Sequence, residues 1–112
     1  MAELGNRVKE TTTSIGTGPI VLGGPVTGCV SFNSTFNIGA TVRYVYDDLT
    51  GNWEYGDGIL GSGTITRSVV LGSSNSGALV NFGAGTKYVF CDAINTDIYE
   101  AANFSKLAIM GY

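Results

Sequence analysis

Glycine divides this chain into short β-prone runs, and this division constrains the fold more than any other feature of the sequence. The 112 residues include 17 glycines and 2 prolines, and the glycines follow no three-residue period, which excludes collagen. The runs between them are rich in Val, Ile, Thr and Tyr, the residue types that favour strands. We expect an all-β fold, an antiparallel β-sandwich or small barrel of about seven to eight short strands, with extended N- and C-terminal arms.

The expected elements follow from where the runs begin and end. The expected strands cover residues 7–13, 19–22, 29–32, 41–47, 52–56, 64–71, 79–82 and 86–91, and residues 35–39 suggest one helical turn or a compact loop. Residues 1–13 form an N-terminal arm or first strand, 14–92 the β-sandwich domain and 93–112 a C-terminal tail, either helical or extended. The side chains expected in the core are Val42, Tyr44, Trp53, Val69, Phe82, Val89 and Phe90.

One glycine run matches the phosphate-binding fingerprint of dinucleotide-binding folds. Residues 56–61 read G-x-G-x-x-G, but that fingerprint requires a helix after the glycines and an acidic residue about 20 positions later. Residues 62–71 are β-prone instead, and residues 77–84 contain no Asp or Glu. We therefore expect a β-turn or glycine bulge between antiparallel strands.

Charge is scarce and unevenly distributed. Charged residues make up 13% of the chain, against about 25% in average globular domains, and the windows 11–42 and 68–86 contain none. A small domain cannot bury two such windows completely, so we expect partner subunits to cover them, since interface cores are depleted of charge. The alternative is a monomer with a Ser-, Thr- and Asn-rich surface. The net charge of −3 and the lack of a basic patch argue against nucleic-acid binding.

The sequence offers little for catalysis or for metal binding. It contains no His, and the adjacent Asp47 and Asp48 point opposite ways on a strand, so we expect no enzyme, cofactor or metal. A Ca²⁺ site formed by Asp47, Asp48 and Asp57 is an alternative to turn formation. Trp53, Tyr55, Tyr44 and Tyr46 are expected in the core, the alternative being an aromatic platform for sugars. Cys29 and Cys91 are expected as reduced thiols, a single bridge being the alternative.

The two ends suggest contact surfaces and location. The first ten residues lack a secretory h-region, and residues 18–32 are too short and too broken by Pro and Gly to span a bilayer, so we expect no membrane association and synthesis in a cytoplasm. The C-terminal tail is more apolar than a free tail should be. The residues expected to contact neighbouring subunits or a larger shell are Val8, Thr11, Ile15, Ile98, Tyr99, Phe104, Leu107 and Ile109.

Four stretches resemble a small β-rich module of virion structural proteins in tailed bacteriophages and prophages. They are NRVKETTT at residues 6–13, GNWEYGDG at 51–58, TITRSVV at 64–70 and SSNSGALVNFGAGTKYVF at 73–90. The resemblance spans residues 6–91 and implies a non-enzymatic virion protein made in the bacterial host cytoplasm. With only one module and a short tail, it favours a homotrimeric capsid decoration protein that binds the major capsid protein on the outside of the head. The alternatives are a tail, neck or fibre attachment module, or a glycan-binding module of the virion.

Overall fold

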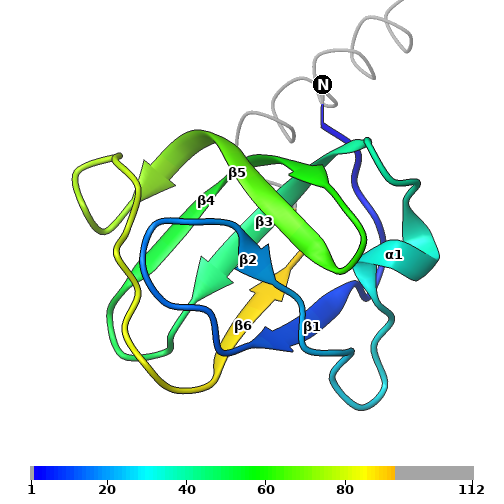
Figure 1. Ribbon diagram of the computed structural model, residues 1–112, viewed down its shortest axis with the longest axis horizontal. Coiled ribbons are helices and arrows are strands. Elements are labelled where there is room, and N and C mark those ends of the chain that lie inside the picture. The colour runs from blue at the N-terminus through cyan, green and yellow to red at the C-terminus, as the bar shows by residue number, and fades with distance from the viewer. Residues whose placement is uncertain (1, 93–112) are drawn as a thin grey trace, which may run out of the picture.

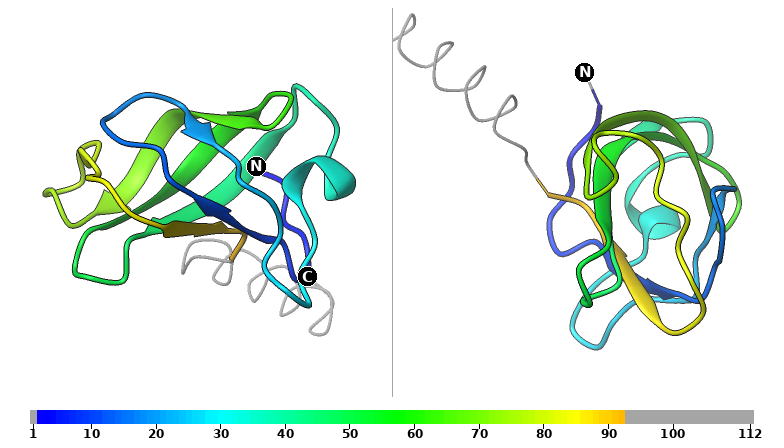
Figure 2. Two further views of the ribbon diagram at one scale, coloured as in Figure 1. Left: turned by 60° about the horizontal axis from the view of Figure 1, so that its bottom comes forward. Right: turned by 90° about the vertical axis from the view of Figure 1, so that its left-hand side faces the viewer.

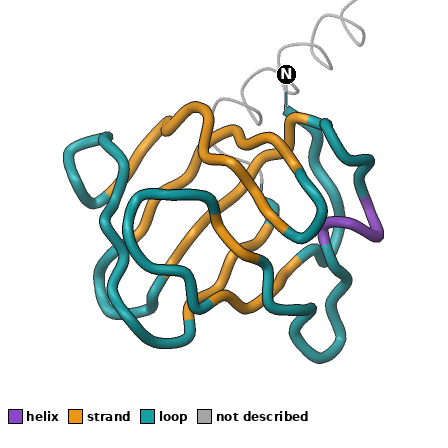
Figure 3. The backbone as a smooth tube through the Cα atoms, viewed as in Figure 1, coloured by secondary structure: helices purple, strands orange, loops and turns teal. Residues whose placement is uncertain are grey.

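A computed structural model describes residues 2–92 as a single β-sheet with one helical turn (Figures 1 and 3). The strands and the helix, in chain order, are β1 (Lys9–Thr12), β2 (Ile20–Val21), α1 (Phe32–Thr35), β3 (Thr41–Asp47), β4 (Trp53–Leu60), β5 (Thr64–Ser73) and β6 (Lys87–Phe90). Strand order across the sheet is β1-β6-β3-β4-β5-β2, and every pairing is antiparallel. The all-β antiparallel fold expected from the sequence is therefore confirmed.

The sheet curls into a nearly closed barrel (Figure 2, right). The chain that follows β2 returns to β1, where Glu10 bridges Pro25 and the Thr11 N–H donates to the Gly24 carbonyl at 3.0 Å. The buried Glu10 carboxylate also accepts the N–H groups of Gly24 and Phe32, so it links this closure to the start of α1. Of the two architectures left open by the sequence, the structure is the barrel.

The sheet contains six strands, fewer than expected. Residues 29–32 contribute a single bridge from Val30 to Val8, because the Ser31 hydroxyl caps Ser34 N–H at 3.1 Å and turns the chain into α1. The helical turn therefore begins earlier than the 35–39 segment that the sequence suggested. Residues 79–82 likewise contribute one bridge, between Phe82 and Gly16.

The core lies inside the barrel, and it corrects two of the expected core residues. Val42, Tyr44, Phe82 and Val89 are buried as expected, together with Tyr46, Ile20, Phe32, Leu60 and Ile65, while Phe90 is half-buried. Trp53 is 40% exposed and Val69 is 49% exposed. Trp53 faces outward because its neighbour Glu54 occupies the inward position on β4. Val69 lies in the part of β5 where two register shifts against β4 interrupt the alternation of faces.

The glycine fingerprint lies within β4 at these same register shifts. Gly56 and Gly58 each follow a shift in the pairing of β4 with β5. A Cβ on Gly56 would collide with the carbonyl oxygen of Val69, and a Cβ on Gly58 would collide with the Ile65 side chain. The glycines thus let the two strands approach where the barrel bends. Of the two expected forms, the structure has the glycine bulge: β4 continues to Leu60, beyond the strand end expected at residue 56, and a strand follows the fingerprint instead of the helix that a phosphate site needs.

The N-terminal segment packs against its own barrel. The Glu3 N–H donates to the Thr41 carbonyl at 2.8 Å and the Arg43 N–H donates to the Glu3 carbonyl at 3.1 Å, which forms a parallel bridge with β3 at Val42. Ala2 is buried. In the part of the chain that the structure describes, no helix has the length and apolarity needed to cross a membrane.

Candidate interaction surfaces

The Glu54 carboxylate is the acceptor at the centre of a hydrogen-bond network inside the barrel. It accepts hydrogen bonds from Arg67 Nε at 3.0 Å, from the Tyr44 hydroxyl at 2.7 Å and from the Val80 N–H at 2.9 Å. Arg67 Nη2 donates in turn to the Val80 carbonyl at 2.8 Å. Burial and the neighbouring Glu54 raise the pKa of Tyr44 well above its usual range, so the hydroxyl stays protonated as a donor. This network fixes residue 80 to the barrel wall.

The network is fully satisfied, which suits a structural role. Among residues 2–92, no buried side-chain nitrogen or oxygen lacks a hydrogen-bond partner. A buried ion pair with complete hydrogen bonding holds one arrangement of the chain, whereas a reactive group needs an accessible lone pair or proton. This cluster therefore anchors the 78–82 segment to the barrel.

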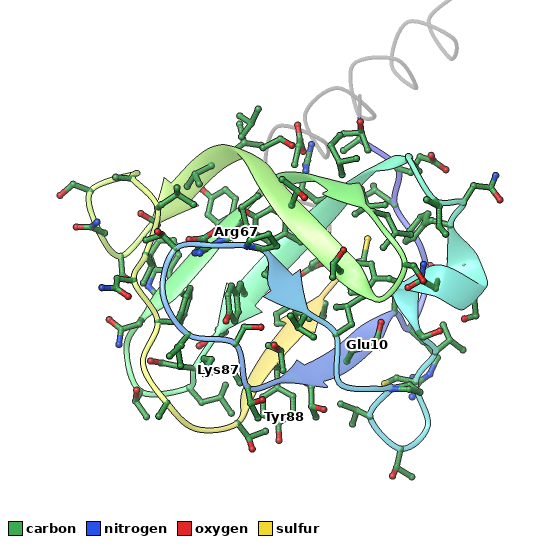
Figure 4. The ribbon with its side chains drawn as sticks, in the orientation of Figure 1. Glu10, Arg67, Lys87 and Tyr88 are labelled. Carbon is green, nitrogen blue, oxygen red and sulfur yellow. The ribbon has the colours of Figure 1, made fainter. Side chains whose placement is uncertain are left out.

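A second buried cation anchors the turn that follows. Lys87 is 1% exposed, and its Nζ donates to the carbonyls of Gly83 and Gly85, both at 2.7 Å. Burial lowers the pKa of Lys87 from its usual range, while Asp48 acts in the opposite direction. Arg67 and Lys87 are the charged residues that border the charge-free window 68–86, and both are buried in the fold (Figure 4).

The two charge-free windows also supply an exposed apolar surface, which has Asp57 at its edge because Asp57 on β4 pairs with Val69 on β5. We call it the uncharged face and define it by five exposed residues: Ile15, Val21, Val69, Leu71 and Leu79. They come from the loop after β1, from β2, from β5 and from the loop after β5. These segments belong to the two charge-free windows of the sequence.

Backbone hydrogen bonds bring the two windows together. Gly16 and Phe82 form a two-hydrogen-bond bridge, with N···O distances of 2.8 and 3.3 Å. The Val21 N–H donates to the Ser14 hydroxyl at 2.7 Å, which closes the loop that carries Ile15. Ser73 Oγ donates to the Ala78 carbonyl at 2.6 Å and so holds the loop before Leu79 against the end of β5. The uncharged face is thus built from segments far apart in the sequence (Figure 1).

A second surface, on the outside of β4, β3 and β6, is aromatic. We call it the aromatic surface and define it by Trp53, Tyr55, Val45, Tyr88 and Phe90. Cross-strand pairing places Phe90 beside Val45 and Val45 beside Tyr55. The Trp53 and Tyr55 rings are parallel within 3°, with centroids 5.9 Å apart. Tyr44 and Tyr46, the other members of the sugar platform considered from the sequence, are buried inside the barrel.

A cation borders the aromatic surface at β1. Lys9 Nζ lies 4.9 Å from the Tyr88 ring centroid and 5.5 Å from that of Phe90. The Tyr55 ring lies directly against Gly72 on β5, where a Cβ would collide with it. Because Gly72 has no side chain, the Tyr55 ring can lie directly against the backbone of β5.

The three aspartates considered for Ca²⁺ have other partners. Asp47 Oδ1 accepts the Leu49 N–H, and Asp48 accepts N–H groups of Thr50 and Asn52 in the β3–β4 turn. Asp57 pairs with Arg43 at 2.7 Å. Burial raises the pKa of Asp48, but the hydrogen bonds from Asn52 and Thr50 outweigh it and hold that pKa at about 2. Within the described residues, no group of three or more His, Cys, Asp or Glu side chains is placed to hold a metal ion.

The predicted contact residues have different positions. Ile15 is 68% exposed on the uncharged face. Thr11 is half-buried and pairs with Tyr88, and Val8 is buried in the core, so its side chain supports the barrel wall and is not presented to a neighbour. The other five, Ile98, Tyr99, Phe104, Leu107 and Ile109, lie outside the described residues. Cys29 and Cys91 are half-buried thiols that are not bridged to each other.

Sequence reasoning missed Val21, Val69, Leu71 and Leu79 as surface residues. The signal was present, because all four belong to the two charge-free windows. Comparison of the chain with protein-family models, with curated proteins and with solved structures gave no match.

Proposed function

We propose that this chain is a non-enzymatic structural protein of a bacteriophage virion, and specifically a capsid decoration protein that binds the outside of the head shell and stabilises it. The observation that carries the proposal is the uncharged face, an exposed apolar surface on a small acidic chain. Surfaces of this kind mark protein–protein contact sites. A capsid lattice offers each copy of such a protein both the shell and neighbouring copies as partners.

The sequence resemblance supports the same class. Two of its stretches, residues 51–58 and 64–70, fall on β4 and β5, which make the most extensive strand pairing in the barrel. They include Trp53 and Glu54 on one strand and Arg67 on the other. The resemblance therefore rests on residues that build the framework and its buried ion pair.

The test is the composition of purified virions. We expect a band of this chain on a protein gel of the particles, with a densitometric copy number comparable to that of the major capsid protein. Antibody labelling should place it on the head. A copy number of a few per particle points to the tail, neck or fibre alternative, and absence of the chain from particles contradicts the proposal.

A glycan-binding module is the second candidate, and the exposure of Trp53 favours it. Trp53 and Tyr55 present parallel rings on the outside of the barrel, and exposed aromatic rings stack on the apolar faces of sugars. Asn52 and Ser74, next to Trp53, carry polar groups, which hydrogen-bond to Asp48 and to the Trp53 N–H within the chain. Titration of the chain with bacterial surface polysaccharide should show binding that Trp53→Ala removes, and no binding by the native chain rejects this candidate.

A further inference from the structure

We infer that the C-terminal tail, residues 93–112, docks on the aromatic surface of its own barrel. The inference goes beyond the proposed function and does not depend on it, because it concerns a contact within one chain. It is carried by the place where the described chain ends and by the burial of Arg43 on the outer side of β3.

The described chain ends beside the aromatic surface. β6 lies between β1 and β3 in the sheet, and its last residue, Phe90, pairs with Val45 in the middle of that surface. The Cys91 N–H still bonds to the barrel, at 3.0 Å from the Val8 carbonyl, and the described residues end at Asp92. The tail therefore starts at the border of the aromatic surface.

This proximity selects the tail as the occupant over a separate partner. A segment tethered beside a surface is present there at an effective concentration of roughly millimolar, which a free apolar partner has to overcome. The aromatic surface covers three neighbouring strands, β6, β3 and β4, which lie about 10 Å from first to last. A segment as long as residues 93–112 spans about 30 Å even as a helix, so the tail reaches the whole surface.

The tail also has the side chains that such a contact requires. Its large apolar residues are Ile94, Ile98, Tyr99, Phe104, Leu107, Ile109, Met110 and Tyr112. Covering them removes apolar area from water on both the tail and the barrel. Asp97 and Glu100 add two carboxylates, and Lys9 at the border of the aromatic surface supplies a cation for them.

The burial of Arg43 indicates that the outer side of β3 is covered. Arg43 lies between Val42 and Tyr44, whose side chains are buried inside the barrel, so its own side chain points outward on the same side as Val45. A long cationic side chain on the outside of a barrel normally extends into water, yet Arg43 is 4% exposed. Docking of the tail over this side of β3 accounts for that burial.

The contact bears on both candidate functions. A docked tail still presents the side chains that face away from the barrel, so it remains available for attachment to a particle. A glycan that stacks on Trp53 and Tyr55 competes with the tail for the aromatic surface. Release of the tail should therefore strengthen any glycan binding there.

The experiment follows tryptic cleavage after Lys106, the only lysine or arginine in residues 93–112. Val45→Asp places a carboxylate in the aromatic surface, and Ile98→Asp places one in the tail, outside the six strands of the barrel. Val21→Asp, at a strand valine that is 58% exposed on β2, is the matched control. Mass spectrometry measures the cleavage rate in the full chain, and circular dichroism with thermal unfolding confirms that each variant is folded.

We expect cleavage after Lys106 to be at least about tenfold slower in the native chain than in a synthetic peptide of residues 93–112, because trypsin acts on the undocked fraction. Val45→Asp and Ile98→Asp should each raise the rate at least about fivefold, since docking then buries an unpaired carboxylate. Val21→Asp should change the rate by less than about twofold, the size of an ordinary surface effect.

Three results overturn the inference. The first is cleavage of the native chain as fast as that of the free peptide, which leaves the tail undocked. The second is slow cleavage that neither Val45→Asp nor Ile98→Asp accelerates more than Val21→Asp does, which places the tail elsewhere. The third is protection that increases with protein concentration, which assigns the tail to a second copy. None of the three depends on the presence of the chain in virions, so this inference and the proposed function fail separately.

Discussion

At the scale of single residues, the glycines of β4 determine whether the barrel can close. A Cβ at Gly56 collides with the Val69 carbonyl, a backbone atom that cannot move without opening β4 from β5. We predict that Gly56→Ala lowers the free energy of unfolding by about 3 kcal/mol or more, as in severe overpacking. Gly83→Ala is the matched control, because nothing lies within 4 Å of its Cβ position, and it should change stability by less than about 0.5 kcal/mol.

Chemical denaturation measures the free energy of unfolding of both variants, and the comparison holds when the two transitions have the same dependence on denaturant concentration. A Gly56→Ala protein as stable as Gly83→Ala means that the two strands separate easily, and the account of the fingerprint as a close-approach site is then wrong.

The outward position of Trp53 lowers the free energy of unfolding that its truncation is expected to cost. Burial of a tryptophan makes its truncation cost about 3–5 kcal/mol, but this side chain is 40% exposed and its ring stacks with that of Tyr55. We predict that Trp53→Ala costs about 1–2 kcal/mol, the sum of partial burial and a ring contact. Urea unfolding of the variant measures this directly. A cost in the range of a buried tryptophan contradicts the outward position.

Asp48 makes the stability of the folded state depend on pH in the acidic range. Its folded pKa of about 2 lies below the ordinary value of 3.8, so it stabilises the folded state above pH 4 and loses that contribution as the pH falls from 4 to 2. We predict that Asp48→Asn flattens the stability curve over this interval by about 1 kcal/mol, allowing for solvent screening. Thermal unfolding of both proteins from pH 6 to pH 2 tests this, and an unchanged acid profile refutes it.

At the scale of elements, the local alternation of apolar and polar residues predicted the strands well. It predicted which side chains point into the core correctly for β3 but not for β4. For β3, the alternating pattern placed Val42, Tyr44 and Tyr46 on one side, and all three are buried. For β4, the same reasoning favoured Trp53 in the core, but Glu54 takes the inward position. Glu54 is tolerated there because Arg67, 13 residues away on β5, supplies the opposite charge. A local pattern cannot show a partner contributed by another strand.

The remaining differences also come from long-range contacts. The strand expected at residues 79–82 is held by side chains of β4 and β5, through Glu54 and Arg67, and by one bridge to Gly16. The uncharged face was detectable in the sequence as two windows without charge, but their meeting at Gly16 and Phe82 depends on the barrel topology.

The Glu54–Arg67 pair therefore acts as the clamp between the β4–β5 hairpin and the 78–82 segment. We predict that Arg67→Met costs about 3–5 kcal/mol, since it leaves a buried carboxylate without its cation. The double variant Glu54→Gln with Arg67→Met should cost less than the sum of the single changes, because no unpaired charge remains. Arg7→Met, at an exposed arginine, is the control. Additive costs in this double-mutant cycle would show that the two side chains act independently.

At the scale of the whole molecule, several of the few charged residues are buried, and large apolar residues are exposed. Arg67, Lys87, Glu54 and Glu10 are buried, where they hold loops and close the barrel. The exposed Ile15 and Leu71 belong to the charge-free windows of the sequence, while Lys9 borders the aromatic surface on the other strands. The molecule thus uses a large share of its few charges for internal anchoring, which leaves apolar surface available for partners.

The barrel should fold without residues 93–112, because all six strands of the nearly closed sheet lie within the described chain. β6, the last strand before that segment, pairs with both β1 and β3, and Glu10 joins β1 to the segment after β2. We predict that deleting residues 93–112 preserves the circular dichroism spectrum and cooperative unfolding but weakens attachment to the particle, since the deletion removes Ile98, Tyr99, Phe104, Leu107 and Ile109. A full-length variant with Leu107→Ser and Ile109→Ser keeps the chain length and should weaken attachment in the same direction. Loss of cooperative unfolding in the truncated chain would place these apolar residues in the barrel's own core, and an unchanged attachment would remove them from the contact.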